Sequence, residues 1–395
     1  MAGYPVYEVD MYSDEVLFDP YPHYRQLRDL GPVVWLESNK LWVVPRYKEM
    51  RAALLNPEVF ISGRGVSANE PANQASSGTT LCSDAPLHDQ LRKFVMKPLL
   101  PKSLTAYIQL FESEADGLVA RLLELESFDA VTDFSHHLPL TVVRDLVGLT
   151  DEGRENMLEW GAAGFNVQGV MNARAMEQLE TIQAIAAHAA ACCADPEEKL
   201  AAGGLGRRVC DGGESGEIPK ELTPSVLLDY IIPSLDTTVL GTASTVLLLA
   251  QNPDQWDLIR SAPDLIPNAI NEALRLESPA RGFTRYVAQD YEVEGVTLEE
   301  GSRVWTPLPS GNRDERIFED PDVFSVERTN ASQHLAFGMG SHICAGMHLA
   351  KLEIGILLKT LVDNGVKRIE LVGRPVYRPN NTLYGLKTLP VRFIT

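Results

Sequence analysis

The sequence predicts a mainly α-helical protein with a minor β portion. Apolar residues recur at helical spacing through most of residues 87–250. Strand-like alternation is confined to two runs before residue 45, to Tyr291–Leu308 and to the end of the chain. At 395 residues the chain could form one large domain, residues 1–395, or two or three smaller ones; no internal repeat occurs, and the composition does not shift beyond 201–217, the only plausible linker.

The N-terminal region mixes element types. A helical pattern covers Tyr21–Leu30, and two strand-like runs, Val33–Glu37 and Leu41–Val44, predict a hairpin. Tyr47–Leu55 predicts a short helix. Residues 61–85 are rich in Gly, Ser, Asn and Pro and show no periodicity, which favours a long loop that acts as a lid.

The middle of the chain predicts a helical body. Its clearest segments are Ser103–Leu125 and Ala173–Cys193, and helices continue to about Leu276. Residues 201–217 contain several glycines and are expected to form a surface loop. Short strands are expected beyond this body, within Tyr291–Leu308 and in the last 30 residues.

Charge and composition exclude several classes of protein. The 35 basic and 54 acidic residues give a net charge of -19, which repels a nucleic-acid backbone. The five cysteines form no CxxC pair, so neither a zinc site nor a disulfide framework is expected. The N-terminus has no basic and apolar leader pattern, and Ser225–Ala250, the most apolar stretch, is interrupted by polar residues and a proline. A cytoplasmic protein without a membrane span is therefore expected.

One stretch carries most of the chemical information. Residues 337–346 read FGMGSHICAG and lead directly into a helical pattern, so three glycines surround Cys344. Glycines permit tight turns and close approach of a flat ligand, and a following helix N-terminus stabilises a thiolate. A lone cysteine is otherwise a small buried apolar residue.

The pattern FGxGxHxCxG resembles the haem-binding loop of the cytochrome P-450 family of haem-thiolate monooxygenases. The resemblance implies the single-domain fold of that family, with haem b (iron protoporphyrin IX) as cofactor and 337–346 as the haem-ligand loop. It makes Cys344 the axial ligand of the iron, and Phe337 and Gly338 part of the cofactor site.

Further matches occur in the order that the family shows. Glu272 and Arg275 form an ExxR pair one helical turn apart, and Arg328 matches the arginine that joins this pair in the family. His88 and Arg92 form an HxxxR pair after Asp84-Ala85-Pro86. Without the resemblance this pair reads as an exposed polar face. With it, four residues are implied to bind the haem propionates: His88, Arg92, Arg285 and His342.

Asp236 and Thr237 match the acid–alcohol part of the family's oxygen-activating helix. The resemblance implies that this pair relays protons to bound oxygen. The alternative is a helical threonine that bonds back to the preceding turn. Pro233 and Ser234 depart from the alanine and glycine usual in the family, and the proline predicts a kink or opening of the helix before Asp236.

The resemblance implies a monooxygenase that inserts one atom of O2 into a substrate, with electrons from NAD(P)H. No ferredoxin or reductase segment is recognised in the sequence, so a separate ferredoxin or flavodoxin with its reductase is expected, and Lys93 and Lys97 are candidates to meet it. A monomer is expected. The rival functions are a haem-thiolate peroxygenase, which uses hydrogen peroxide directly, and a non-catalytic haem-binding protein; the acid–alcohol pair argues against both.

The substrate is expected to be small, apolar and aromatic, and the reaction to be hydroxylation or oxidative O-demethylation. Apolar residues dominate the expected substrate-contacting positions: Phe165, Val167, Ile232, Leu235, Phe283 and Leu383. The RGV in the first loop and the ending Asn380–Pro390 resemble members of the family that oxidise para-substituted aromatic compounds. Arg64 and Ser67 could then bind a substrate carboxylate, and a solvated lid arginine is the alternative.

Overall fold

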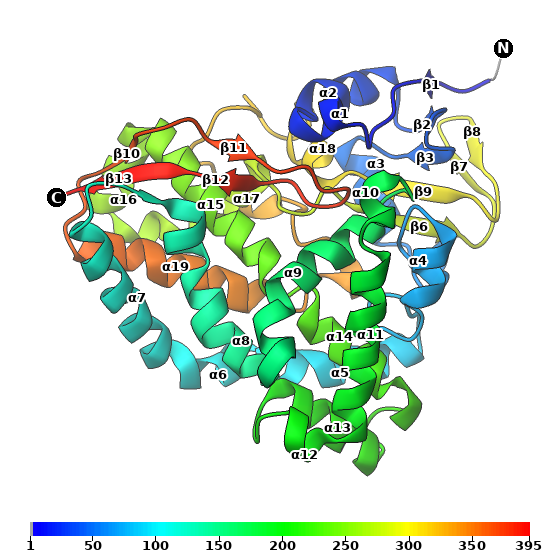
Figure 1. Cartoon of the computed structure of the whole chain (residues 1–395). Coiled ribbons are helices and arrows are strands. Elements are labelled where there is room, and N and C mark those ends of the chain that lie inside the picture. Colours follow the sequence, from blue (N-terminus) through cyan, green and yellow to red (C-terminus); the bar gives the residue numbers. More distant parts are fainter. Residues whose placement is uncertain (1–2) are drawn as a thin grey trace.

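The largest sheet is built from strands within residues 6–61 and residues 283–306. The computed structural model describes residues 3–395. Six strands lie in the order β1 (Val6–Tyr7), β2 (Val34–Leu36), β3 (Leu41–Val43), β9 (Arg303–Thr306), β6 (Phe283–Val287) and β4 (Phe60–Ile61). β2 and β3 form the predicted antiparallel hairpin, with Val34 opposite Val43. Figure 1 shows this sheet at one end of the molecule, beside the helical body.

Four α-helices lie between strands of this sheet in the sequence: α1 (Asp14–Phe18), α2 (Tyr21–Leu30), α3 (Tyr47–Leu54) and α4 (Glu70–Ala75). α2 and α3 confirm the predicted helices. α4 lies within the 61–85 segment, where only a loop was expected. Asn69 caps this helix, because its side-chain oxygen accepts a hydrogen bond from Ala72 N at 2.9 Å. The lid role of the segment stays a prediction.

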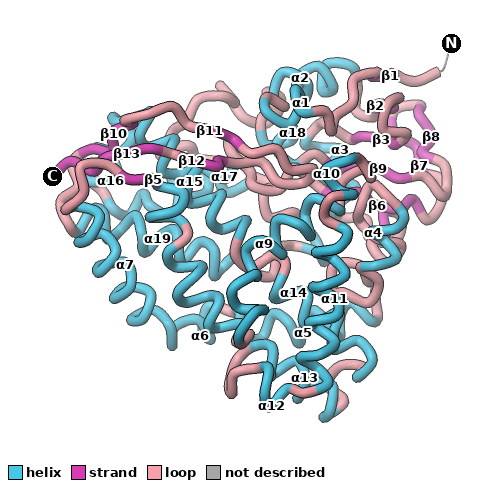
Figure 2. The backbone as a smooth tube through the Cα atoms, in the orientation of Figure 1, coloured by secondary structure: helices cyan, strands magenta, loops and turns pink. Residues whose placement is uncertain are grey.

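The remaining helices form the body that Figures 1 and 2 show below and beside the sheets. They are α5 (Leu87–Met96), α6 (Pro101–Leu104), α7 (Ile108–Leu123), α8 (Arg144–Val147), α9 (Asp151–Val167), α10 (Ala173–Met176), α11 (Leu179–Ala194), α12 (Pro196–Lys199), α13 (Leu205–Ser215), α14 (Thr223–Ile231), α15 (Asp236–Gln251), α16 (Pro253–Ser261), α17 (Ile266–Leu276), α18 (Leu308–Asn312) and α19 (Met347–Asp363). α15 is almost wholly buried and packs against α17 and α19. The predicted mainly α-helical class is confirmed.

The prediction of a surface loop over 201–217 is wrong for residues 205–215, which form α13. Leu205, Val209 and Cys210 share a buried face of this helix. The glycines serve packing: a Cβ at Gly212 would lie 2.5 Å from a ring carbon of Phe94. Glycine here therefore marks a close helix contact rather than a turn.

The C-terminal strands complete the β portion. β13 (Pro390–Ile394) lies between β10 (Arg368–Leu371) and β5 (Phe128–Asp129), while β11 (Val376–Tyr377) pairs with β12 (Leu386–Thr388). β7 (Tyr291–Val293) and β8 (Val296–Leu298) form a separate hairpin. Strands were predicted in both regions. Within 291–308 they end at Thr306, and α18 begins at Leu308.

The central helical stretch is interrupted before Asp236, as Pro233 predicts. α14 ends at Ile231 and α15 begins at Asp236. Proline has no N–H to donate, and its ring would clash with the carbonyl four residues back, here that of Asp229. In the described part of the chain, Lys220–Gln251 is the one stretch long and apolar enough for a membrane span, but 78% of its most apolar window is buried within the protein. It has the character of a core helix.

Candidate active site

The loop before α19 is folded tightly around Cys344. Gly338 and Gly340 have φ values of +68° and +75°, which side chains disfavour. A Cβ at Gly340 would also lie 2.6 Å from the Leu54 carbonyl oxygen. The Cys344 N–H donates to the Phe337 carbonyl at 2.8 Å and closes the loop. The glycines of the FGxGxHxCxG pattern thus hold the backbone in this shape.

Cys344 lines the main cavity, whose volume is about 430 Å³. Burial raises the pKa of its thiol, whereas the backbone N–H groups of Gly346 and Met347 and the charge of Arg92 lower it. These donors face the sulfur at the start of α19 and would favour a thiolate. A bound metal ion would complete the deprotonation.

Basic side chains gather beside Cys344. The rings of His88 and His342 lie 4.1 Å apart between centroids, and Arg92 donates to the Ile343 carbonyl. Arg285 is buried, and burial lowers its pKa to about 10. Burial, followed by the nearby cations, lowers the pKa of His342 to about 3.

This basic cluster lacks its own counter-charge. In the described residues no carboxylate forms an ion pair with Arg92 or Arg285, and the buried Nε2 of His88 has no partner. Buried cations without counter-ions are costly. Two carboxylates of a flat ligand lying against Cys344 would satisfy them, so the four residues, together with Phe337 and Gly338 in the cavity wall, could hold haem.

Asp236 and Thr237 face different cavities. Thr237 lines the main cavity, and its hydroxyl donates to the Pro233 carbonyl at 3.0 Å. This is the hydrogen bond to the preceding turn that the alternative interpretation of Thr237, as an ordinary helical threonine, predicts. Asp236 is buried beside a second cavity of about 110 Å³, where it pairs with Arg378. Burial raises the pKa of Asp236, and Arg378 and then His136 lower it. Sequence reasoning identified neither basic partner.

The walls of the main cavity are mostly apolar. Phe165, Val167, Ile232 and Phe283 line it, as expected, whereas Leu235 and Leu383 do not. Leu383 packs behind the wall, in a small cluster with Phe165 and Leu240.

The expected carboxylate anchor is not found at this cavity. Arg64 is exposed and lies over the Tyr286 ring, with its guanidinium carbon 6.0 Å from the ring centroid. Ser67 is buried, but neither residue lines the cavity. A polar wall residue that the sequence analysis did not select is Asp229 on α14, whose Oδ2 accepts from Thr80 N at 2.9 Å.

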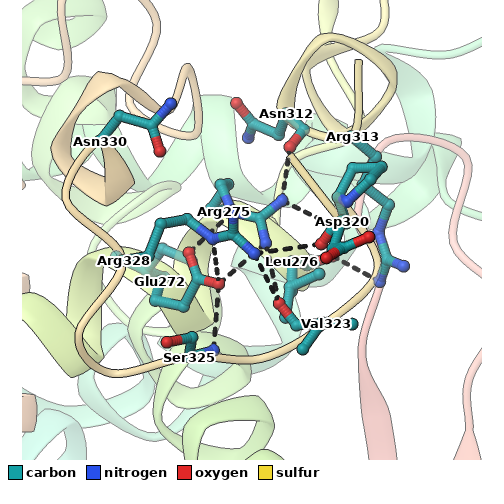
Figure 3. A network of polar contacts seen from close by, with 12 residues as sticks. Glu272, Arg275, Leu276, Asn312, Arg313, Asp320, Val323, Ser325, Arg328 and Asn330 are labelled. Atoms are coloured by element: carbon teal, nitrogen blue, oxygen red, sulfur yellow. Dashed lines mark hydrogen bonds and ion pairs between the residues drawn. The ribbon is translucent and has the colours of Figure 1, made fainter. Parts of the chain in front are cut away.

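The ExxR pair anchors the chain segment that leads to the cysteine loop. Glu272 and Arg275 form two hydrogen bonds of 2.7 and 2.8 Å, and Arg328 reaches the same carboxylate at 2.8 Å. Figure 3 shows the three side chains pointing toward one another. Arg275 also donates to the Asn312 carbonyl at 2.8 Å. The predicted pairing and the contribution of Arg328 are confirmed.

Relatives of this chain are known. The family model for cytochrome P450 matches residues 220–365. The chain is 36% identical to cytochrome p450 CYP199A2 of Rhodopseudomonas palustris, over 99% of this chain and 95% of that protein. It is 30% identical to linalool 8-monooxygenase of Pseudomonas putida, over 97% of each. The solved structure of P450BioI in complex with hexadec-9Z-enoic acid ligated acyl carrier protein aligns with a TM-score of 0.83 at 27% identity, covering 96% of this chain and 100% of that one.

Sequence similarity over nearly the whole chain, the shared fold and the cysteine loop agree with one another. The chain belongs to the cytochrome P450 family of monooxygenases, which use haem b and O2 and receive electrons from NAD(P)H through redox partners.

Proposed function

We propose that this enzyme hydroxylates, or oxidatively O-demethylates, a small apolar aromatic substrate in the main cavity. The observation that carries the proposal is the cavity itself, which has Cys344 and Thr237 in its wall together with the rings of Phe165 and Phe283. Aromatic side chains in an apolar wall favour flat aromatic ligands through edge and stacking contacts.

The residues around Cys344 are proposed to hold the haem. Cys344 would hold the iron through its thiolate, and Phe337 and Gly338 would line the cofactor site. His88, Arg92, Arg285 and His342 would bind the propionates, which would give Nε2 of His88 a partner and the two arginines a counter-charge. When bound, thiolate-ligated haem iron supplies the chemistry that cleaves the O–O bond and oxidises the substrate.

Thr237 and Asp236 are proposed to move protons on the opposite wall. The Thr237 hydroxyl donates to the Pro233 carbonyl, so its oxygen can accept a hydrogen bond from a water and orient that water. Asp236 takes up protons on the side of the second cavity, next to Arg378 and His136. Apolar side chains make up most of the cavity wall and limit the entry of other water.

A separate ferredoxin or flavodoxin, with its reductase, is proposed to supply the electrons in the cytoplasm, and the enzyme is proposed to act as a monomer without nucleic-acid partners. Lys93 is exposed on α5, the helix that also carries His88 and Arg92, and the exposed Lys97 directly follows that helix. They offer positive charge on a chain whose net charge of -19 would otherwise repel an acidic donor.

The proposal is tested by adding small aromatic compounds to the holoenzyme and recording the haem spectral shift that displacement of distal water produces. Compounds that bind are then incubated with NAD(P)H, a ferredoxin and its reductase. Hydroxylated or demethylated product that requires all three supports the proposal. Product formed equally well with hydrogen peroxide alone would indicate a peroxygenase, and binding without turnover a haem-binding protein.

A further inference from the structure

A single acidic side chain lies in the wall of the main cavity. Among the described residues that line it, Asp229 is the only carboxylate. The arginines of this wall, Arg92 and Arg285, belong to the cluster beside Cys344, whose charges are proposed to be used by the propionates. Asp229 lies on α14, eight residues before Thr237, where it feels the charge of Arg92 but forms no ion pair with it among the described residues.

Asp229 accepts hydrogen bonds from its neighbours but has no cationic partner among the described residues. Its Oδ2 accepts from Thr80 N at 2.9 Å, and in the described residues it forms no ion pair. Burial raises the pKa of Asp229 to about 6, against the lowering effect of Thr80, Arg92 and the Leu81 backbone N–H. The hydrogen bonds and Arg92 favour the ionised carboxylate, which places a negative charge in the wall of an apolar cavity.

The backbone N–H groups of Thr80 and Leu81 hold the carboxylate, but hydrogen bonds from neutral amides do not neutralise its charge. A buried charge is compensated when a cation pairs with it. In a cavity that receives substrate, the substrate can supply that cation.

We propose that the substrate carries a cationic amine that pairs with Asp229, while the carbon to be oxidised lies at the other end of the molecule, near Thr237. This inference rests on the proposed aromatic substrate class and adds to it the charge of one substituent.

The test uses an isosteric pair, (4-methoxyphenyl)trimethylammonium and neutral 4-tert-butylanisole, together with the smaller anion 4-methoxybenzoate. The quaternary nitrogen has no lone pair and cannot ligate iron. Dissociation constants are measured on the holoenzyme by titration calorimetry. The cation is expected to bind at least tenfold more tightly than the neutral isostere, and the anion most weakly. Equal or tighter binding of the neutral or anionic ligand would overturn the inference.

Variants assign the preference to one side chain. Asp229→Asn retains an acceptor for Thr80 N and should lower the cation-to-neutral affinity ratio at least tenfold, while Asp229→Leu should reverse the preference. Glu221→Gln is the matched control, because it removes one exposed negative charge close to α14 and should leave the ratio unchanged. Thermal unfolding of each holoenzyme checks folding. An unchanged ratio in a folded Asp229→Asn enzyme would refute the assignment.

The outcomes separate this inference from the proposed function. If 4-tert-butylanisole is bound and oxidised but the cation is not preferred, the aromatic monooxygenase proposal stands and the role of Asp229 fails. If none of the three ligands binds, both fail.

Discussion

Arg378 donates a hydrogen bond to Asp236 on the side of α15 that faces away from the Thr237 hydroxyl. The acid and the alcohol are neighbours in sequence, yet they line separate cavities. Protons proposed to pass from one to the other must therefore cross α15, through rotation of the Asp236 side chain or through water. The two residues should consequently give different mutant phenotypes.

Replacing Thr237 by valine should uncouple oxygen reduction from product formation. The shape of the side chain is retained while the hydroxyl that orients protons is lost. We expect unchanged substrate affinity, a several-fold lower product yield per NAD(P)H consumed, and more hydrogen peroxide. Thr242→Val is the control, because Thr242 makes the same kind of hydrogen bond, to Thr238 O at 2.9 Å, outside the cavity lining. An unchanged yield in Thr237→Val would assign the role to another donor.

Replacing Asp236 by asparagine should slow turnover about 100-fold, the lower limit for loss of a general acid or base. Substrate affinity should not change, since Asp236 does not line the main cavity. The kinetic solvent isotope effect on turnover should increase, because proton delivery becomes limiting. Arg378→Lys preserves the positive charge beside the carboxylate and should retain most of the activity. A normal rate in Asp236→Asn would exclude this carboxylate from proton delivery.

Replacing Cys344 by alanine should abolish the thiolate signature in the carbon monoxide difference spectrum. Cys344 lies in the loop 337–346, where backbone N–H groups face its sulfur. Cys210 is buried on α13 and does not line the cavity. Cys210→Ala should therefore keep the signature. Loss of the signature in Cys210→Ala alone would contradict the assignment of the axial ligand.

Replacing Glu272 by glutamine should destabilise the protein by about 3–5 kcal/mol, because Arg275 would keep a buried charge without its partner. Both side chains of this pair are fully buried. Unfolding in urea, followed by fluorescence, gives the free energy. Asp257→Asn breaks the exposed pair with Arg260 and should change stability by no more than about 0.5 kcal/mol. Equal effects of the two substitutions would show that the buried network adds little.

Reversing the charges of Lys93 and Lys97 to glutamate should slow reduction by an acidic ferredoxin several-fold at low salt. The defect should shrink as ionic strength rises, because salt screens exposed charges. Stopped-flow reduction measures the rate. Lys40→Glu with Lys367→Glu makes the same charge change at two exposed lysines, between β2 and β3 and just before β10, and should have little effect. A rate that depends on neither Lys93 nor Lys97 would locate docking elsewhere.

Features that could be predicted from the sequence have their partners nearby in the chain. The glycines around Cys344 predict a tight loop, and the ExxR spacing predicts an ion pair within one helix. The position of Pro233 predicts the helix interruption. Asp236 and Arg378 lie 142 residues apart, and nothing in the local pattern selects one partner from 35 lysines and arginines. Helix α13 was not predicted, because in the sequence the glycines that permit its close contact with another helix cannot be told from the glycines of a loop.

The interruption between α14 and α15 divides the cavity wall into two pieces whose main supports differ. α15 packs against α17 and α19, whereas α14 packs against α11 and α13, and both helices also contact α9. Substitutions on α14, Asp229 among them, can therefore alter which molecules the enzyme accepts without disturbing the helix that carries Thr237. Substrate range and oxygen chemistry can then diverge independently, both in evolution and in directed redesign.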